Sequence, residues 1–237
     1  MTSSNDRILW PRVLIEGVVI VGSILLAFGI EAWWDGVQDR GAEEAHLMAL
    51  DSDLTESIRL LEASDTGFAY VRSSLRRLVE TDVVAQPKDS IAKWALRGLW
   101  TLSEYEPRLS SLDDLEASDQ LGLLAPEVRR QVSAVNRALA DLGTFQLNLR
   151  TVQESLLDPF LMDELPIGPA LASTLDLSVP TPLPEASEWT PLGSSGWRNR
   201  MMIKLTALKN ASIRRMSLHD ELQLLQALVT ARLAELN

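Results

Sequence analysis

Residues Val13 to Trp34 read VLIEGVVIVGSILLAFGIEAWW, and the fourteen residues between Glu16 and Glu31 carry no charge. A helix of this length is about 33 Å long, enough to cross the hydrocarbon layer of a bilayer, which is about 30 Å thick. An uninterrupted apolar run has no polar face to present to water, so a core position in a soluble domain is disfavoured. The sequence therefore predicts a transmembrane helix over residues 13–34.

A cleaved signal peptide is a second interpretation of this segment, with Ala27-Phe28-Gly29 as a loose small-x-small site. Glu16 is unusual in the basic region of a signal peptide, and the helical pattern continues through the supposed cleavage site. Trp10 precedes the span, and Trp33 and Trp34 end it, as expected of aromatic residues at the two membrane interfaces. These features favour a membrane anchor.

Basic residues predict the orientation of the span. Arg7 and Arg12 precede it, whereas Arg40 is the only lysine or arginine between Trp34 and Ile58. Positive charges favour the cytoplasmic side, so we expect a short cytoplasmic tail over residues 1–12 and the rest of the chain outside the cytoplasm. In a bacterium this means the inner membrane and the periplasm. Arg12 is then an interfacial anchor together with the three tryptophans.

Two stripes of the span are predicted to contact other helices, one with Glu16, Ile20, Ser23, Ala27 and Glu31 and another with Gly22, Gly29 and Gly36. Small residues allow a second helix to approach closely, and carboxylates within a membrane usually face protein rather than lipid. The predicted contact residues are Glu16, Ile20, Gly22, Ser23, Ala27 and Gly29. A simple alternative is that Glu16 and Glu31 lie near the headgroups and are hydrated.

The remaining chain has the composition of a helical domain. A hydrophobic fraction of 46% allows a core, while a net charge of −11 argues against nucleic-acid binding. The chain has no cysteine, which excludes disulfides and thiolate chemistry. We expect no cofactor and no metal ion. The expected partners are the lipid bilayer and other membrane-protein helices, in a larger complex or in a homo-oligomer.

Apolar residues that recur every seven positions predict three long helices. They are Leu47, Leu54, Leu61, Phe68 and Leu75; Val128, Val135, Leu142, Leu149 and Leu156; and Met201, Leu205, Leu208, Leu222, Leu225, Val229, Leu233 and Leu236. No segment alternates as a strand would, so the predicted fold is all-α: a membrane helix that continues into a periplasmic antiparallel bundle. The predicted divisions are 1–12, 13–34, 35–158, 159–196 and 197–237.

Several local features accompany these helices. Residues 159–196 contain seven of the eleven prolines, which predicts a long loop of extended, polyproline-like backbone packing on the bundle. Polar residues interrupt two of the seams, and they either set the register or face elsewhere: Gln146, Gln153, Ser212 and Arg215. The predicted helix caps are Asp89 or Ser90 and Ser110 or Ser111. Pro126 in a first turn opens one long helix, and Ser194 or Ser195 leads into the last one.

Two motifs carry a family resemblance. In the first, Glu16 precedes an apolar run closed by Trp34-Asp35, and Leu50-Asp51-Ser52-Asp53-Leu54 follows in a polar helix. The second, looser motif is the segment 112–121, followed by Pro126-Glu127-Val128-Arg129. The chain resembles a large bacterial family of single-span membrane proteins known as a domain of unknown function, whose members often have Gly-Arg where this chain has Asp119-Gln120. The resemblance implies one span and an α-helical periplasmic domain, and it supplies no activity.

Residue types that perform chemistry are sparse. His46 and His219 are far apart and are better explained as surface residues than as a metal pair. The acidic cluster Asp113, Asp114, Glu116 and Asp119 fits a solvated helix start better than a cation site or an acid–base pair. Four tryptophans, Trp94, Trp100, Trp189 and Trp197, are expected in packing, and one of the first two should face outward.

The predicted function is that of a membrane-anchored accessory or scaffolding subunit of a larger inner-membrane complex, without enzymatic activity. It would act through helix–helix contacts of the span and the bundle. The alternative is a periplasmic module that senses a small ligand and signals through a partner membrane protein, and an apolar cavity inside the bundle would favour it. A hydrolase that uses the carboxylates between Asp113 and Asp119 is a third, weaker hypothesis.

Overall fold

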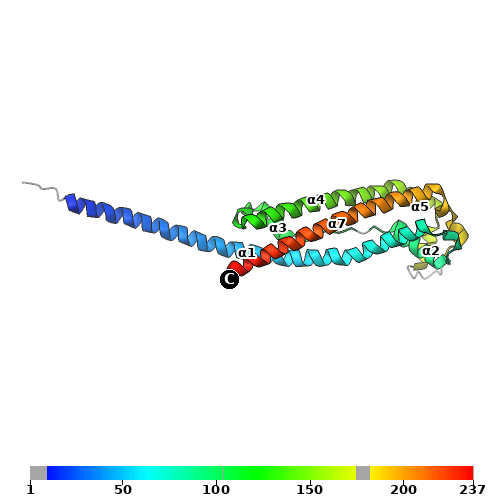
Figure 1. Cartoon of the computed structure of the whole chain (residues 1–237), viewed down its shortest axis with the longest axis horizontal. Helices are drawn as coiled ribbons and strands as arrows, with labels where there is room; N and C mark the ends of the chain where they lie inside the picture. The colour runs from blue at the N-terminus through cyan, green and yellow to red at the C-terminus, as the bar shows by residue number, and fades with distance from the viewer. Residues whose placement is uncertain (1–9, 103, 175–181, 237) are drawn as a thin grey trace, which may run out of the picture.

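The computed structural model describes residues 10–102, 104–174 and 182–236, without the side chains of residues 10–13 and 174. Within these ranges every regular element is helical and no strand occurs, which confirms the all-α prediction. Figure 1 shows an elongated molecule in which the first part of α1 projects from one end of a helical bundle.

Helix α1 (Trp10–Glu80) is one continuous helix of 71 residues. At 1.5 Å per residue it is about 107 Å long, and neither Gly36 nor Gly41 interrupts it. The prediction that the apolar segment continues into a much longer helix is therefore confirmed. Its seam residues from Leu47 to Leu78 are buried, as the heptad pattern indicates.

The chain then turns and returns along the bundle. A 3-10 turn η1 (Val83–Ala85), helix α2 (Lys88–Ala95) and a π-helical turn η2 (Leu96–Trp100) form the far end of the molecule. An irregular segment leads back to α3 (Ser110–Ala117) and the 3-10 turn η3 (Gln120–Leu123). This return segment is fixed to α1, because the Tyr105 hydroxyl donates to the Ser57 carbonyl at 2.9 Å.

Helix α4 (Pro126–Val152) begins with the predicted proline in its first turn and continues into a second π-helical turn, η4 (Gln153–Leu157). The last helix, α7 (Ser195–Leu236), packs along both α1 and α4. Its polar pairs with other elements include Arg232 with Glu43, Arg215 with Asp65, Glu221 with Gln131, and Lys204 with Gln153. In Figure 1, α1 and α4 both run from the side of the span toward the far end of the bundle. Helix α7 begins at the far end and runs back toward the span.

The proline-rich region differs from the prediction. It contains α5 (Asp158–Glu164), α6 (Ile167–Thr174) and the 3-10 helix η5 (Ala186–Gly193), so extended, polyproline-like backbone is wrong for these residues. Pro159 lies in the first turn of α5, where a proline costs no hydrogen bond. Pro159 thus starts a helix, and Pro191 lies inside η5, whereas Pro182 and Pro184 lie outside helices. Pro180 lies outside the described residues.

Two predicted helix caps are also wrong. Helix α2 follows Pro87 and has no side-chain cap, so neither Asp89 nor Ser90 has that role. At α3, Asp53 of α1 accepts a hydrogen bond from the Ser111 amide at 2.8 Å. A carboxylate from a different helix therefore satisfies the exposed amide of this helix start, which a local pattern does not reveal.

The buried apolar residues form two clusters along the bundle. The near cluster, on the side of the span, joins α1 residues 47–61, α3, the first half of α4 and the second half of α7. The far cluster joins α1 residues 68–78 to α2, η2, η4, α5, α6, η5 and the first half of α7. Six residues of the proline-rich region are buried in the far cluster: Leu161, Leu165, Ile167, Ala170, Trp189 and Leu192.

Candidate functional site

The apolar part of α1 is exposed along its whole described length. It meets the length and hydropathy criteria for one membrane-spanning helix, and none of its most apolar window is buried against the rest of the structure. Large apolar side chains stand free there, for example Val18 at 69% exposure and Leu26 at 66%. A helix with such a surface in water exposes far more apolar area than a soluble monomer normally does.

The predicted contact residues all lie on this exposed part of α1: Glu16, Ile20, Gly22, Ser23, Ala27 and Gly29. No described atom of another element comes within 4 Å of a Cβ placed on Gly22 or Gly29, so a second helix would have free access to both. The Ser23 hydroxyl donates to the Val19 carbonyl at 2.7 Å, which satisfies it within its own helix. The structure brings no other part of the described chain to this face.

Two of the predicted anchors are visible where the span ends. Trp33 and Trp34 are 62% and 61% exposed, and their ring centroids lie 6.3 Å apart. Trp10 and Arg12 lie within α1, but the structure does not describe their side chains. The exposed indoles are suited to a membrane interface, where one side of the ring is apolar and the other is wet.

An ion pair fixes the base of the bundle beside the span. Glu43 of α1 is buried, and it accepts hydrogen bonds from two nitrogens of Arg232 of α7 at 2.9 and 3.0 Å. The paired carboxylate raises the pKa of the Arg232 guanidinium further above its usual range. This two-point contact joins the end of α7 to α1 within a few turns of the predicted membrane surface.

A buried arginine separates the two apolar clusters. Arg215 of α7 is 2% exposed and donates to Asp65 of α1 at 2.7 Å, to Ser64, and to the Leu61 carbonyl at 3.3 Å. Its guanidinium also lies 5.0 Å from the ring centroid of Phe68. The polar centre of the last seam is therefore an interhelical contact, which answers a question that the sequence left open.

The return segment is held beside this arginine. Ser57 of α1 both accepts from the Arg108 amide and donates to the Arg108 carbonyl, each at 2.9 Å. Burial raises the pKa of the Tyr105 hydroxyl to about 12, so this group stays protonated and keeps donating to Ser57. Gln146 of α4 donates to the Tyr105 carbonyl at 3.2 Å, so this seam glutamine connects α4 to the return segment.

The most unusual group in the molecule is a lysine enclosed in the far cluster. Lys204 of α7 has no exposed surface, and its ammonium donates to Gln153 Oε1 at 2.6 Å, the Leu99 carbonyl at 3.0 Å and the Thr101 carbonyl at 3.4 Å. All three acceptors are neutral. Burial lowers the pKa of Lys204 to about 7, and the charge of Asp158 partly opposes this effect.

Both π-helical turns converge on this lysine. Leu99 belongs to η2, and Gln153 begins η4, where its amide also donates to Asp158. A π-turn inserts one residue into a helix and redirects the groups that follow. Gly98 of η2 lies directly on α1, because a Cβ there would be 2.8 Å from the Leu75 nitrogen.

The lysine site joins α7 to η2, to η4 and to the residue that follows η2. Its ammonium is satisfied by three acceptors and has no exposed surface, so the arrangement suits a structural contact. Sequence reasoning missed Lys204 and Gly98. One signal was present: Lys204 is placed between Met201 and Leu208 on the buried stripe of α7.

The other chemical candidates are dispersed. His219 lies 3.3 Å from Glu62, far along α1 from His46. In the acidic cluster, Glu116 accepts from Asn136 at 2.7 Å, and Asp119 ends α3 with a left-handed φ of 56°. Among the described residues no three histidine, aspartate or glutamate side chains gather as a metal site would require.

The tryptophans follow the prediction. Trp189 and Trp197 are buried in the far cluster, and the indole of Trp197 donates to Glu164 at 2.7 Å. Trp94 packs partly on the same cluster below Arg77, whereas Trp100 is 41% exposed. One of the first two therefore faces outward, as the six-residue spacing indicated.

The fold and these contacts define an all-helical protein with one candidate membrane-spanning helix. No family model, no curated protein and no solved structure matches this chain. The resemblance stated above stays a prediction.

Proposed function

We propose that this protein is a membrane-anchored accessory or scaffolding subunit of a larger bacterial inner-membrane complex, without enzymatic activity. One observation carries the proposal: an uncovered apolar helix is continuous with a helical bundle whose polar contacts join helices to one another. Such a chain offers surfaces for binding partners. The bundle lies in the periplasm and packs as an antiparallel arrangement around α7.

The continuity of α1 supports an anchor over the two other interpretations of the apolar segment. A core helix of a soluble domain would be mostly buried, whereas this one is uncovered. A signal peptide would be cut near Ala27-Phe28-Gly29, in the interior of a continuous helix. The proposed orientation of the span follows from the basic residues: Arg7 and Arg12 precede it, whereas Arg40 is the only lysine or arginine between Trp34 and Ile58.

The buried polar residues support a role in assembly. Helix α1 binds side chains of α7 and the backbone of the return segment through Glu43, Asp65 and Ser57. At the far end, Lys204 of α7 donates to Gln153 of η4. These contacts make the bundle one body that extends about 60 Å beyond Arg40 along α1. A partner bound in the membrane and a partner bound at the far end would thus be held at a fixed separation.

Purification of the full chain in a mild detergent tests the proposal. We expect co-purifying membrane protein, or an oligomer of this chain, and we expect its loss when Gly22→Ile and Ala27→Ile fill the predicted contact face. The matched control is Val21→Ile with Phe28→Leu, which lie outside both predicted contact stripes and should retain the partner. A strictly monomeric particle without co-purifying protein contradicts the proposal.

The alternative function, ligand sensing through a partner protein, would use the same continuous helix to carry a movement to the membrane. The grooves that the structure displays are open channels on the surface, such as the one between α1 and α7, and they differ from an apolar chamber inside the bundle. This difference favours the scaffolding role.

A further inference from the structure

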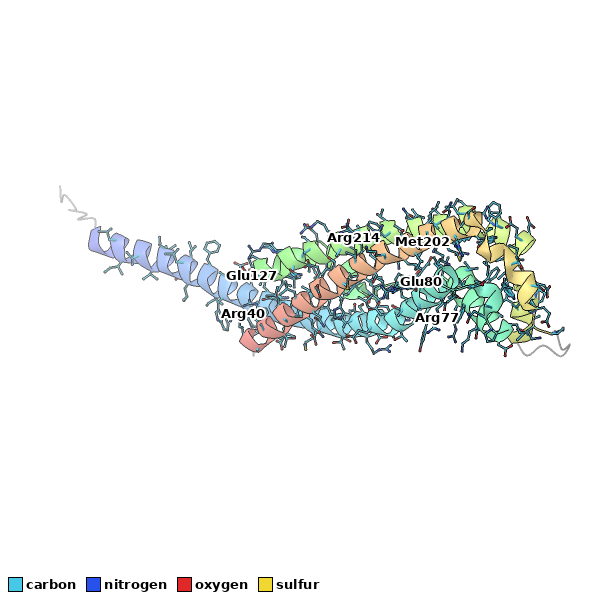
Figure 2. The ribbon with its side chains drawn as sticks, turned by 45° about the vertical axis from the view of Figure 1, so that its right-hand side comes forward. Arg40, Arg77, Glu80, Glu127, Met202 and Arg214 are labelled. Carbon is cyan, nitrogen blue, oxygen red and sulfur yellow. The ribbon has the colours of Figure 1, made fainter. Side chains whose placement is uncertain are left out.

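A groove runs between the outer half of α1 and the first half of α7, in the far part of the bundle. It encloses about 900 Å³, and Figure 2 shows Met202 of α7 opposite Glu80 of α1 across it. Val79 and Leu205 form its apolar floor over the far cluster. Tyr70 and Met202 remain 55% and 49% exposed on its sides. The guanidinium of Arg97 lies 5.5 Å from the centroid of the Tyr70 ring, and the groove otherwise presents apolar surface that is open to solvent.

Cations surround this apolar floor. Arg72 and Arg76 stand one helical turn apart on α1, and Lys209 faces them from α7. Glu80 pairs with Arg76 at 2.6 Å, but Arg72 and Lys209 make no ion pair within the described part of the chain. The whole chain has a net charge of −11, so this groove is a local cationic surface on an acidic protein. Such a field attracts acidic groups to the groove and repels them from the rest of the molecule.

The shape of the groove limits what would fill it. From Ala69 to Glu80 it follows α1 for about 16 Å, or three helical turns. Its walls are open to solvent, so a small amphiphile would stay largely exposed, whereas ligand pockets normally bury most of the ligand. A helix laid along the groove would bury one apolar stripe on the floor and extend side chains toward both cationic walls.

The position of the groove also excludes the headgroups of the anchoring bilayer. Ala69 lies about 50 Å beyond Trp34 along a continuous helix, so those lipids do not reach it. We propose that the groove binds an acidic amphipathic helix of a partner protein, with apolar residues on one stripe and carboxylates on its two flanks. This inference rests on the proposed scaffolding role and names the chemistry of one partner.

A labelled groove and two synthetic peptides test the inference. Because the chain has no cysteine, Thr206→Cys places a single environment-sensitive fluorophore in the groove of the full chain in detergent. The two peptides are helices of equal length with the same leucine stripe, one flanked by glutamates and the other by lysines. We expect saturable binding of the glutamate peptide only. Arg72→Glu with Lys209→Glu should weaken that binding by at least about tenfold.

The matched control reverses two exposed cations of α4 that also lack ion pairs in the described structure, Arg129→Glu with Arg137→Glu. It changes the net charge equally and should leave the affinity nearly unchanged. Equal binding of the lysine peptide, equal effects of the two double variants, or no saturable binding would overturn the inference. So would competition by vesicles of anionic phospholipid, or protein self-association that removes the peptide signal.

The co-purification experiment at the span is independent of this one. If the protein co-purifies with a membrane partner but does not bind the glutamate peptide, only the groove proposal is rejected. Peptide binding by a strictly monomeric protein would reject the proposed complex and retain the groove.

Discussion

The two buried cations of α7 differ in the charge of their hydrogen-bond partners. Arg215 pairs with the carboxylate of Asp65, whereas Lys204 is held by two backbone carbonyls and the neutral amide of Gln153. An ammonium that loses its hydration without gaining a close carboxylate is destabilised relative to the neutral amine. Lys204 is therefore the group whose protonation should be most strongly coupled to folding.

The stability of the protein should consequently rise with pH above neutrality. The pKa of Lys204 is about 7 in the folded state against 10.5 for an exposed lysine, so between these values the unfolded chain binds more protons. This contribution is complete above the unfolded pKa and is lost as the pH falls through 7. From pH 7 to pH 9 it amounts to about 2 kcal/mol, at about 1.4 kcal/mol per pH unit.

Denaturant unfolding of the wild type and of Lys204→Met at both pH values measures this coupling. Other titrating groups cancel in the difference, so the wild type should gain about 2 kcal/mol relative to the variant between the two pH values. A difference that does not change with pH would mean that Lys204 keeps an ordinary pKa in the folded protein.

A second residue-scale prediction concerns the end of α3. Asp119 is the only described non-glycine residue with a positive φ, 56°, a conformation in which a Cβ is unfavourable. Asp119→Gly should raise the free energy of unfolding by about 0.5 to 1 kcal/mol, and Asp119→Ala should lower it. Thermal melts of the two variants with the wild type check the order. Equal melting temperatures would show that the turn does not constrain this residue.

At the scale of elements, periodic apolar patterns predicted the helices correctly, whereas individual prolines were a poor guide to where helices are absent. The seven-residue apolar repeat located α1, α4 and α7, because each helix buries one stripe. The prolines of residues 159–196 suggested extended backbone, yet Pro159 occupies a helical first turn that tolerates it. A proline removes one backbone donor and restricts the residue before it, but the first turn of a helix accommodates it, as at Pro159.

The contacts that define the candidate sites depend on pairs of distant residues. Asp53 of α1 meets the start of α3 only in the folded bundle. Leu99 and Gln153 likewise come together around Lys204 only when the helices are packed. No local spacing encodes such pairs. The span is the opposite case, because its length and composition are local properties, and its contact face remains a prediction from sequence.

The close approach of η2 to α1 gives a prediction at this scale. Gly98→Ala would place a Cβ 2.8 Å from the Leu75 nitrogen, and backbone must move to admit it. We expect a loss of about 1 to 3 kcal/mol in unfolding free energy. Gly143→Ala in α4 is the control, since nothing lies within 4 Å of that site, and it should stabilise the helix by up to about 1 kcal/mol. If both variants had the same effect, η2 would not be in tight contact with α1.

At the scale of the whole molecule, α1 belongs to both halves of the architecture. Its first part is uncovered and apolar, and its second part supplies one wall of each apolar cluster. The pair of Glu43 and Arg232 joins α7 to α1 where these parts meet. Because backbone hydrogen bonds continue through this region, the bundle and the span should move as one body.

This rigidity is measurable as a distance across the junction. The protein has no native cysteine, so Val37→Cys and Ser73→Cys can carry a pair of spin labels on α1. Thirty-six residues of continuous helix separate the labels by about 54 Å, and double electron–electron resonance should report a narrow distribution near that value. Insertion of two glycines after Gly41 should broaden it, because the added residues favour a break in the helix. A broad distribution in the protein without the insertion would show a hinge between the two labels, for example at Gly41, and the bundle would then be tethered to its anchor without being held at a fixed orientation.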